Sequence, residues 1–144
     1  MTTDTAVEDI IGQLRASGGR ITSPRRAILE ALVGHAGHPT AEELTTAVQR
    51  RHPDVHESTV YRFLDDLERL RIVDHVHLGH GPAVYHFTID SHHHLACGSC
   101  GVVIEIPMRS LTELRRKLRA QFAFEVDLRH FGIPGRCKAC SGDG

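Results

Sequence analysis

Four cysteines and twelve histidines are the residues of this sequence best suited to chemistry. The cysteines form two C-x2-C pairs, Cys97/Cys100 and Cys137/Cys140, separated by residues 101–136. Each pair directs two thiolates at one ion, and four thiolates match the tetrahedral coordination of zinc. A disulfide is less favoured in a reducing compartment, and a redox C-x-x-C needs only one pair. We therefore expect a structural zinc with no open position for catalysis.

Several histidines are spaced for chelation. His75 and His77 are two residues apart, as are His92 and His94, so each pair points to one face of a strand. A lone histidine is more often a surface or core residue than a ligand, but two such pairs beside a zinc motif favour ligation. Imidazole suits nickel, zinc and copper, so ligand type does not choose among them.

Composition restricts the class of protein. The 40% hydrophobic and 24% charged residues indicate a globular chain, and each half alone would build a thin core, which favours a dimer. The net charge of -1 gives no support for nucleic-acid binding. The first residues are acidic and lack a long apolar run, which predicts neither a signal peptide nor a membrane span. A cytoplasmic location without a membrane partner is expected.

The first half reads as a winged helix-turn-helix. Helical stripes or capping signals occur at 7–15, at Ser23 with Pro24, at Thr40 with Glu43, and from Glu57 or Ser58 onward. Two strand-like segments, 72–78 and 83–88, flank the glycine-rich turn 79–82. Helices followed by such a hairpin are typical of winged DNA-binding domains.

The fourth helix offers polar side chains off its apolar stripe. Hydroxyl and guanidinium groups near a helix N-terminus read phosphates and base edges, whereas an ordinary bundle helix is the alternative. An arginine-rich stretch before and within the second helix suits phosphate contacts, and a solvated helix face is the alternative. The candidate DNA-binding residues are Arg20, Arg25, Ser58, Thr59, Tyr61 and Arg62.

The second half predicts a small α/β unit. Strands are expected at 95–97, 102–106 and 124–131, with a helix at 110–122. The segment 88–91 is the expected hinge. The sequence thus predicts an α+β protein with a winged-helix domain at 1–88 and a metal-binding dimerisation domain at 89–144.

Three segments together resemble the ferric uptake regulator superfamily over essentially the whole chain. They are Ser58–Leu64, His92–Gly101 and Gly135–Cys140. The resemblance implies a homodimeric repressor of palindromic operator DNA, without a small-molecule substrate. Its dimerisation domain contains the four-cysteine zinc site, and a sensing metal lies at the hinge.

The resemblance also implies the sensing ligands. They match His38, His92 and His94 here, with Glu105 nearby. The spacing before Cys97 is one residue shorter than in the family. The candidates for a fourth ligand are His86, Asp90 and His93.

Within the superfamily the chain is most similar to the nickel-responsive branch. That branch has a second site matching His75, His77 and His130, and it controls nickel uptake and oxidative-stress genes. Zinc or ferrous iron as the regulatory metal is the alternative. Iron and zinc members usually have histidine where this chain has Arg129, and the peroxide sensor has aspartate in place of Glu105.

Two other classes compete with a regulator. A metalloenzyme needs an open coordination position and a nearby base, for which Glu105 is the only evident candidate. A metal-storage protein leaves the helix-turn-helix without a role. We expect no enzyme.

Overall fold

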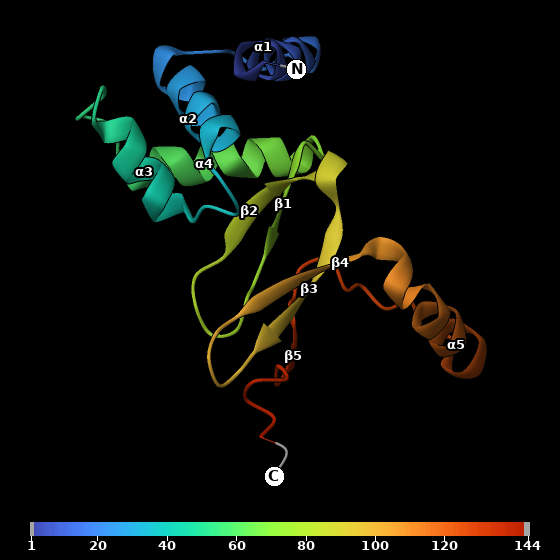
Figure 1. The fold of residues 1–144 in the computed structure, drawn as a ribbon. Helices are drawn as coiled ribbons and strands as arrows, with labels where there is room; N and C mark the ends of the chain where they lie inside the picture. Colours follow the sequence, from blue (N-terminus) through green and yellow to red (C-terminus); the bar gives the residue numbers. More distant parts are fainter. Residues whose placement is uncertain (1, 143–144) are drawn as a thin grey trace. The chain divides into compact units, whose positions relative to one another are not determined.

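Helices packed beside a two-stranded sheet form the first unit of the computed structural model, which describes residues 2–142 (Figure 1). This unit comprises Met1–Asp74 and Val84–Thr88. Its helices and strands are α1 (Thr3–Ala16), α2 (Ser23–Gly34), α3 (Ala41–Gln49), α4 (Glu57–Arg69), β1 (Val73–Val76) and β2 (Val84–Phe87), and β1 continues into the second unit. The predicted helices are thereby confirmed.

Side-chain caps begin α2 and α3. The Thr40 hydroxyl accepts the amide of Glu43 at 3.1 Å, and the Glu43 carboxylate accepts the amide of Thr40 at 2.8 Å, as the capping box predicts. The expected cap of α2 at Ser23 is wrong by one residue. The extended residue Thr22 accepts the Arg25 amide at 3.4 Å, which places Ser23 inside the helix.

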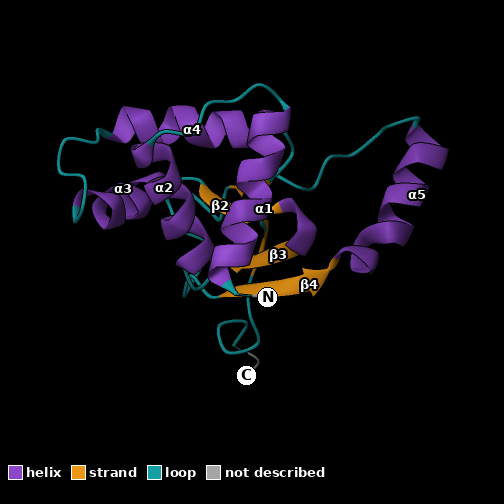
Figure 2. Cartoon of the chain, turned by 90° about the horizontal axis from the view of Figure 1, so that it is seen from above, coloured by secondary structure: helices purple, strands orange, loops and turns teal. Residues whose placement is uncertain are grey.

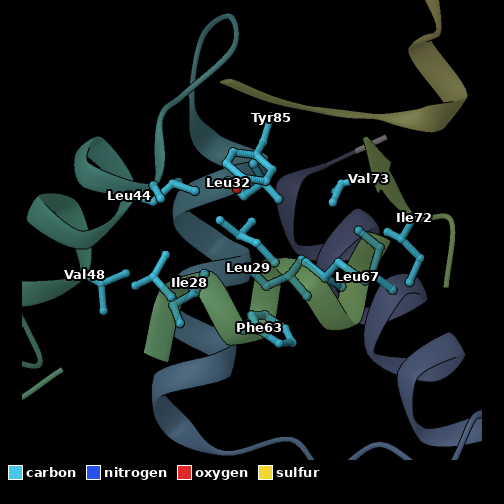
Figure 3. Packing of buried hydrophobic residues seen from close by; sticks show 14 of the residues in the cluster. Ile28, Leu29, Leu32, Leu44, Val48, Phe63, Leu67, Ile72, Val73 and Tyr85 are labelled. Carbon is cyan, nitrogen blue, oxygen red and sulfur yellow. The ribbon is translucent and has the colours of Figure 1, made fainter. Parts of the chain in front are cut away.

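The core of the first unit comes from the apolar stripes of its four helices (Figure 3). Leu29 of α2 and Leu64 of α4 are fully buried, and Tyr85 of β2 adds an aromatic ring beside Leu32. Burial raises the pKa of the Tyr85 hydroxyl to about 12. This packing fixes the orientation of α4, the candidate DNA-reading helix.

The second unit is a three-stranded sheet with one helix. It comprises His75–Ala83 and Ile89–Gly144 and has the strand order β4-β3-β5, with β4 antiparallel and β5 parallel to β3. In Figure 2, α5 extends away from the end of β4. The elements are η1 (Thr88–Asp90), β3 (His92–Cys97), β4 (Val103–Pro107), η2 (Met108–Leu111), α5 (Thr112–Phe122) and β5 (Ile133–Gly135).

The strand predicted at 124–131 is wrong, and a shorter strand, β5, follows it. Asp127 accepts the backbone amide and the guanidinium of Arg129, each at 3.0 Å. This local turn pairs the Arg129 amide, which would otherwise donate to the hydrogen-bond ladder of a sheet. Alternation of apolar residues in this segment therefore does not produce a strand.

The unit boundary also differs from a single cut after residue 88. The segment 75–83 belongs to the second unit, where the His77 amide donates to His130 O at 2.9 Å and the Gly132 amide donates to His77 O at 2.8 Å. The α+β class is confirmed. Within the described residues, no helix is both long and apolar enough to cross a bilayer.

Truncating the core should destabilise the protein more than truncating its surface. We expect Leu29→Ala, at a side chain with 0% exposure, to lower the free energy of unfolding by about 2–5 kcal/mol because it leaves a cavity. Leu70→Ala, at 38% exposure, should cost about 1 kcal/mol or less. Urea unfolding of the zinc-loaded protein measures both, and equal losses would contradict the packing described.

Candidate metal centres and nucleic-acid-binding helix

The four cysteine sulfurs converge at one end of the second unit. Cys97 ends β3, Cys137 follows β5, and all four sulfurs lie within 4.8 Å of one another. The Sγ atoms of Cys100 and Cys137 are 3.7 Å apart. A tetrahedral zinc with Zn–S bonds of about 2.3 Å requires sulfurs about 3.8 Å apart, so the cluster fits this ion.

Backbone geometry forms the first knuckle. The Gly101 amide donates to Cys97 O at 3.0 Å, and Gly101 has a φ of +75°, which permits the tight return into β4. The Gly98 amide donates to Gly135 O at 2.9 Å. The hydrogen bonds of β3 to β4 and β5 thereby bring the two C-x2-C pairs together.

The protonation of these cysteines favours a bound cation. Backbone amides of Cys100, Cys137 and Ser99 lower the pKa of Cys97 to about 6 because they stabilise its thiolate. The sulfurs of Cys100 and Cys137 raise the pKa of Cys140 to about 12 because they retain its proton. Four thiolates can coexist here at neutral pH only when a cation compensates their charge.

A second group of ligand atoms lies on β3 and β4. His92 and His94 share one face, with ring centroids 4.5 Å apart and Nε2 atoms 3.0 Å apart. The register places Glu105 opposite His94, and Glu105 Oε1 is 3.5 Å from His92 Nε2. His92 Nδ1 bonds to Asp90 O, which leaves Nε2 of His92 for a ligand role. These three side chains can hold an ion through nitrogen and oxygen.

The first unit presents its own histidine pair. The rings of His38 and His86 have centroids 5.3 Å apart, and His86 is 8% exposed. The segment before α3 is fixed to β2 because the Tyr85 amide donates to Pro39 O at 2.9 Å. The structure thus brings together two predicted residues that are far apart in sequence.

The other candidates for a fourth ligand are placed differently. Asp90 lies in the exposed η1 turn and uses its backbone carbonyl toward His92. His93 is 2% exposed and lines a cavity with Arg115 and residues 125–129. Among the described residues, neither belongs to the ligand group of His92, His94 and Glu105.

The three histidines of the predicted second site lie together in the second unit. The His75 ring is 5.4 Å from that of His77 and 4.8 Å from that of His130, measured between centroids. His130 Nδ1 is 3.1 Å from His75 O, and Asp127 Oδ2 is 3.9 Å from His130 Nε2. All three side chains are half-buried.

The candidate DNA-binding residues divide into two groups. Ser58, Tyr61 and Arg62 are exposed on α4, and Thr59 is half-buried beside them. Arg25 instead contacts α4, with an ion pair to Asp66 at 2.7 Å and its guanidinium 5.1 Å from the centroid of the Phe63 ring.

Arg20 lies at the surface, and its carbonyl accepts the Arg25 guanidinium at 3.2 Å. Arg25 is therefore committed to orienting α4, a role that its position in the sequence did not reveal.

Comparisons with known proteins agree on one family. The model of the ferric uptake regulator family matches residues 16–130. The peroxide-responsive repressor PerR of Staphylococcus epidermidis is 30% identical over 141 residues, covering 98% of this chain and 94% of the relative. These proteins are named as regulators, which favours regulation over the metalloenzyme and storage alternatives.

Solved structures support the fold. The Helicobacter pylori ferric uptake regulator Fur, with three functional metal-binding sites, gives a TM-score of 0.74 at 19% identity, covering 99% of this chain and 96% of that one. A zinc uptake regulator in complex with zinc and DNA gives a TM-score of 0.68 at 22% identity, covering 98% of this chain and 96% of that one.

Loss of one cysteine should release the ion that the cluster binds. We expect Cys140→Ser to lower the zinc content and the melting temperature, because three thiolates and a hydroxyl bind zinc more weakly than four thiolates. Ser99→Ala keeps the backbone amide that donates to Cys97 and serves as the control. Metal analysis and calorimetry measure both, and unchanged zinc content in Cys140→Ser would contradict the four-cysteine assignment.

Proposed function

Because the chain belongs to the ferric uptake regulator family, we propose that it is a metal-responsive transcriptional repressor and that nickel is the metal it senses. The observation that carries this proposal is a pair of neighbouring histidine side chains on each unit. His38 and His86 lie on the first unit, and His92 and His94 lie on the second beside Glu105. Neither pair alone completes a coordination sphere.

We infer that these side chains bind one ion together. His38 from the DNA-binding unit and His92 with His94 from the dimerisation unit are the central ligands, and Glu105 supplies a carboxylate beside them. A shared ion restricts the angle between the units, whereas the metal-free protein samples many angles. If the bound metal tightens operator binding by a given factor, operator DNA must tighten metal binding by that same factor, typically about 5- to 150-fold.

Nickel is favoured by the nitrogen-rich donor sets. The cluster of His75, His77 and His130 supplies three imidazoles, and the proposed hinge set supplies three more from His38, His92 and His94 with the Glu105 carboxylate. A given nitrogen and oxygen site binds nickel more tightly than ferrous iron. Zinc is the second candidate because imidazole suits both ions, and the four-cysteine cluster is assigned to structural zinc.

Dimerisation is supported by the exposed apolar surface of the second unit. α5 contributes no buried residue, and β4 presents Val103 and Ile104 at 38% and 45% exposure. Apolar side chains left exposed in this way are typical of an interface. Other large apolar side chains exposed in this unit are Val102, Leu114, Phe122, Phe124 and Phe131.

A homodimer presents two copies of α4. Helices of this kind enter successive major grooves about one helical turn apart, so we expect a palindromic operator. We propose that Ser58, Thr59, Tyr61 and Arg62 face the DNA and that the regulated genes serve nickel uptake and oxidative-stress defence. The zinc uptake regulator of the same fold forms a complex with DNA.

Nickel should promote operator binding at a lower free concentration than zinc or ferrous iron. We expect His92→Ala to weaken this nickel response at least about tenfold, because one imidazole ligand is lost. His75→Ala should weaken it through the second cluster, and the exposed His35→Ala should leave it unchanged. Fluorescence anisotropy with buffered metals measures the response, and a greater response to zinc would replace nickel with zinc in the proposal.

Substitution of two arginines should distinguish a residue that contacts DNA from one that stabilises the fold. We expect Arg62→Ala to weaken operator binding roughly tenfold and to flatten its salt dependence, with the melting temperature unchanged. Arg25→Ala should lower the melting temperature, since it removes the contacts to Asp66 and Phe63. Anisotropy at several salt concentrations and thermal unfolding test both, and the reverse pattern would exchange the two roles.

A further inference from the structure

His93 occupies the face of β3 opposite to the metal-binding pair. Successive side chains of a strand alternate, so His92 and His94 point one way and His93 the other. The His93 side chain is 2% exposed, and neither ring nitrogen has a hydrogen-bond partner among the described residues. Leaving such a polar group without a partner costs on the order of 1–3 kcal/mol, so a ligand that hydrogen-bonds to this ring would be favoured.

A cavity of about 290 Å³ adjoins His93. Two arginines line it, Arg115 from α5 and Arg129 from the loop before β5. This volume is at the small end of the range for ligand sites, which suits an inorganic oxyanion or a small organic acid. The remaining lining residues are Glu125, Val126, Asp127 and Leu128.

One cation that lines this cavity, Arg115, is not neutralised by a carboxylate of the described residues. The Asp127 carboxylate is engaged by Arg129 at 2.8 Å, and the Glu125 carboxylate is engaged by Arg119 at 2.5 Å. Within residues 2–142, no carboxylate lies within ion-pair distance of Arg115. A metal ion is disfavoured here because guanidinium groups line the cavity and both carboxylates are already paired.

We propose that this cavity is an anion-binding site for a small molecule with carboxylate or phosphate oxygens. Arg115 supplies the charged partner, and an N–H of the His93 ring supplies a hydrogen bond. Guanidinium groups pair with such oxyanions in a bidentate geometry, which gives both strength and direction. The ligand thereby gives the buried imidazole a hydrogen-bond partner and the exposed Arg115 guanidinium a counter-charge.

Anion binding should also act on the metal site. His93 lies between His92 and His94 in β3, so a ligand that fixes His93 restricts the strand that presents both metal ligands. A ligand that orders this strand reduces the conformational entropy that is lost when the metal binds. Anion binding and metal binding therefore favour each other. This coupling rests on the proposed metal-sensing function, whereas the anion site itself does not.

Calorimetric titration of the full-length, zinc-loaded, nickel-free protein tests the site. Inorganic phosphate and succinate are titrated separately, so that the result distinguishes a phosphate ligand from a carboxylate ligand. We expect saturable binding of at least one, weakened about tenfold or more by Arg115→Gln through loss of a charge-assisted hydrogen bond. His93→Phe, which retains a planar ring, should weaken it as well.

Arg116→Gln is the matched control. Arg116 is the next residue of α5, but it pairs with Glu113 at 2.6 Å and does not line the cavity. Binding should survive this change. Absence of saturable binding to both probes, or an equal loss in Arg116→Gln, would overturn the site.

The coupling is tested by nickel titration at buffered free nickel, with and without the anion that binds. We expect the anion to tighten nickel binding about fivefold in the parent protein and to have no effect in Arg115→Gln. Unchanged nickel affinity in the presence of bound anion would overturn the coupling. Failure of nickel binding together with intact anion binding would overturn the proposed function while supporting the anion site.

Discussion

The alternation of side chains along β3 is the constraint on which the metal chemistry depends. A strand sends neighbouring residues to opposite faces, so His92 and His94 converge while His93 is directed away from them. Pairing with β4 places Glu105 beside the first two, and pairing with β5 places the second C-x2-C pair beside Cys97. Small shifts of this strand would therefore alter several sites at once.

Electrostatics favours a bound cation at the end of this sheet. Backbone amides favour the thiolate of Cys97, yet the sulfurs around Cys140 retain its proton. A divalent cation would resolve this conflict by compensating the charge of all four sulfurs, and its binding free energy would then contribute to folding. The sheet is small and much of its apolar surface is exposed, so a metal cluster and a partner subunit are both suited to stabilising it.

In the first unit, packing rather than metal fixes the helix proposed to read DNA. The buried stripe of α4 faces α2, and Arg25 adds an ion pair to Asp66 and a contact with the Phe63 ring. On the other side of α4, Ser58, Tyr61 and Arg62 are exposed. His38 is attached to the same unit through the contact between Pro39 and Tyr85, which connects a candidate metal ligand to the DNA-reading body.

The sequence alone was sufficient for features determined by local periodicity and spacing. The capping box at Thr40, the apolar stripes of the helices and the two C-x2-C pairs each follow from residues within a few positions of one another. The α+β class followed from the same patterns. Local rules work here because helix caps, helix faces and metal knuckles are formed by neighbours in the chain.

Only the tertiary structure decided which distant groups meet. The segment 124–131 alternates like a strand, but the hydrogen bonds between Asp127 and Arg129 form a turn instead. Residues 75–83 join the second unit through His77 and His130, and Arg25 packs on α4. Partners like these are far apart in sequence or compete with the local pattern, so their contacts depend on how the whole chain packs.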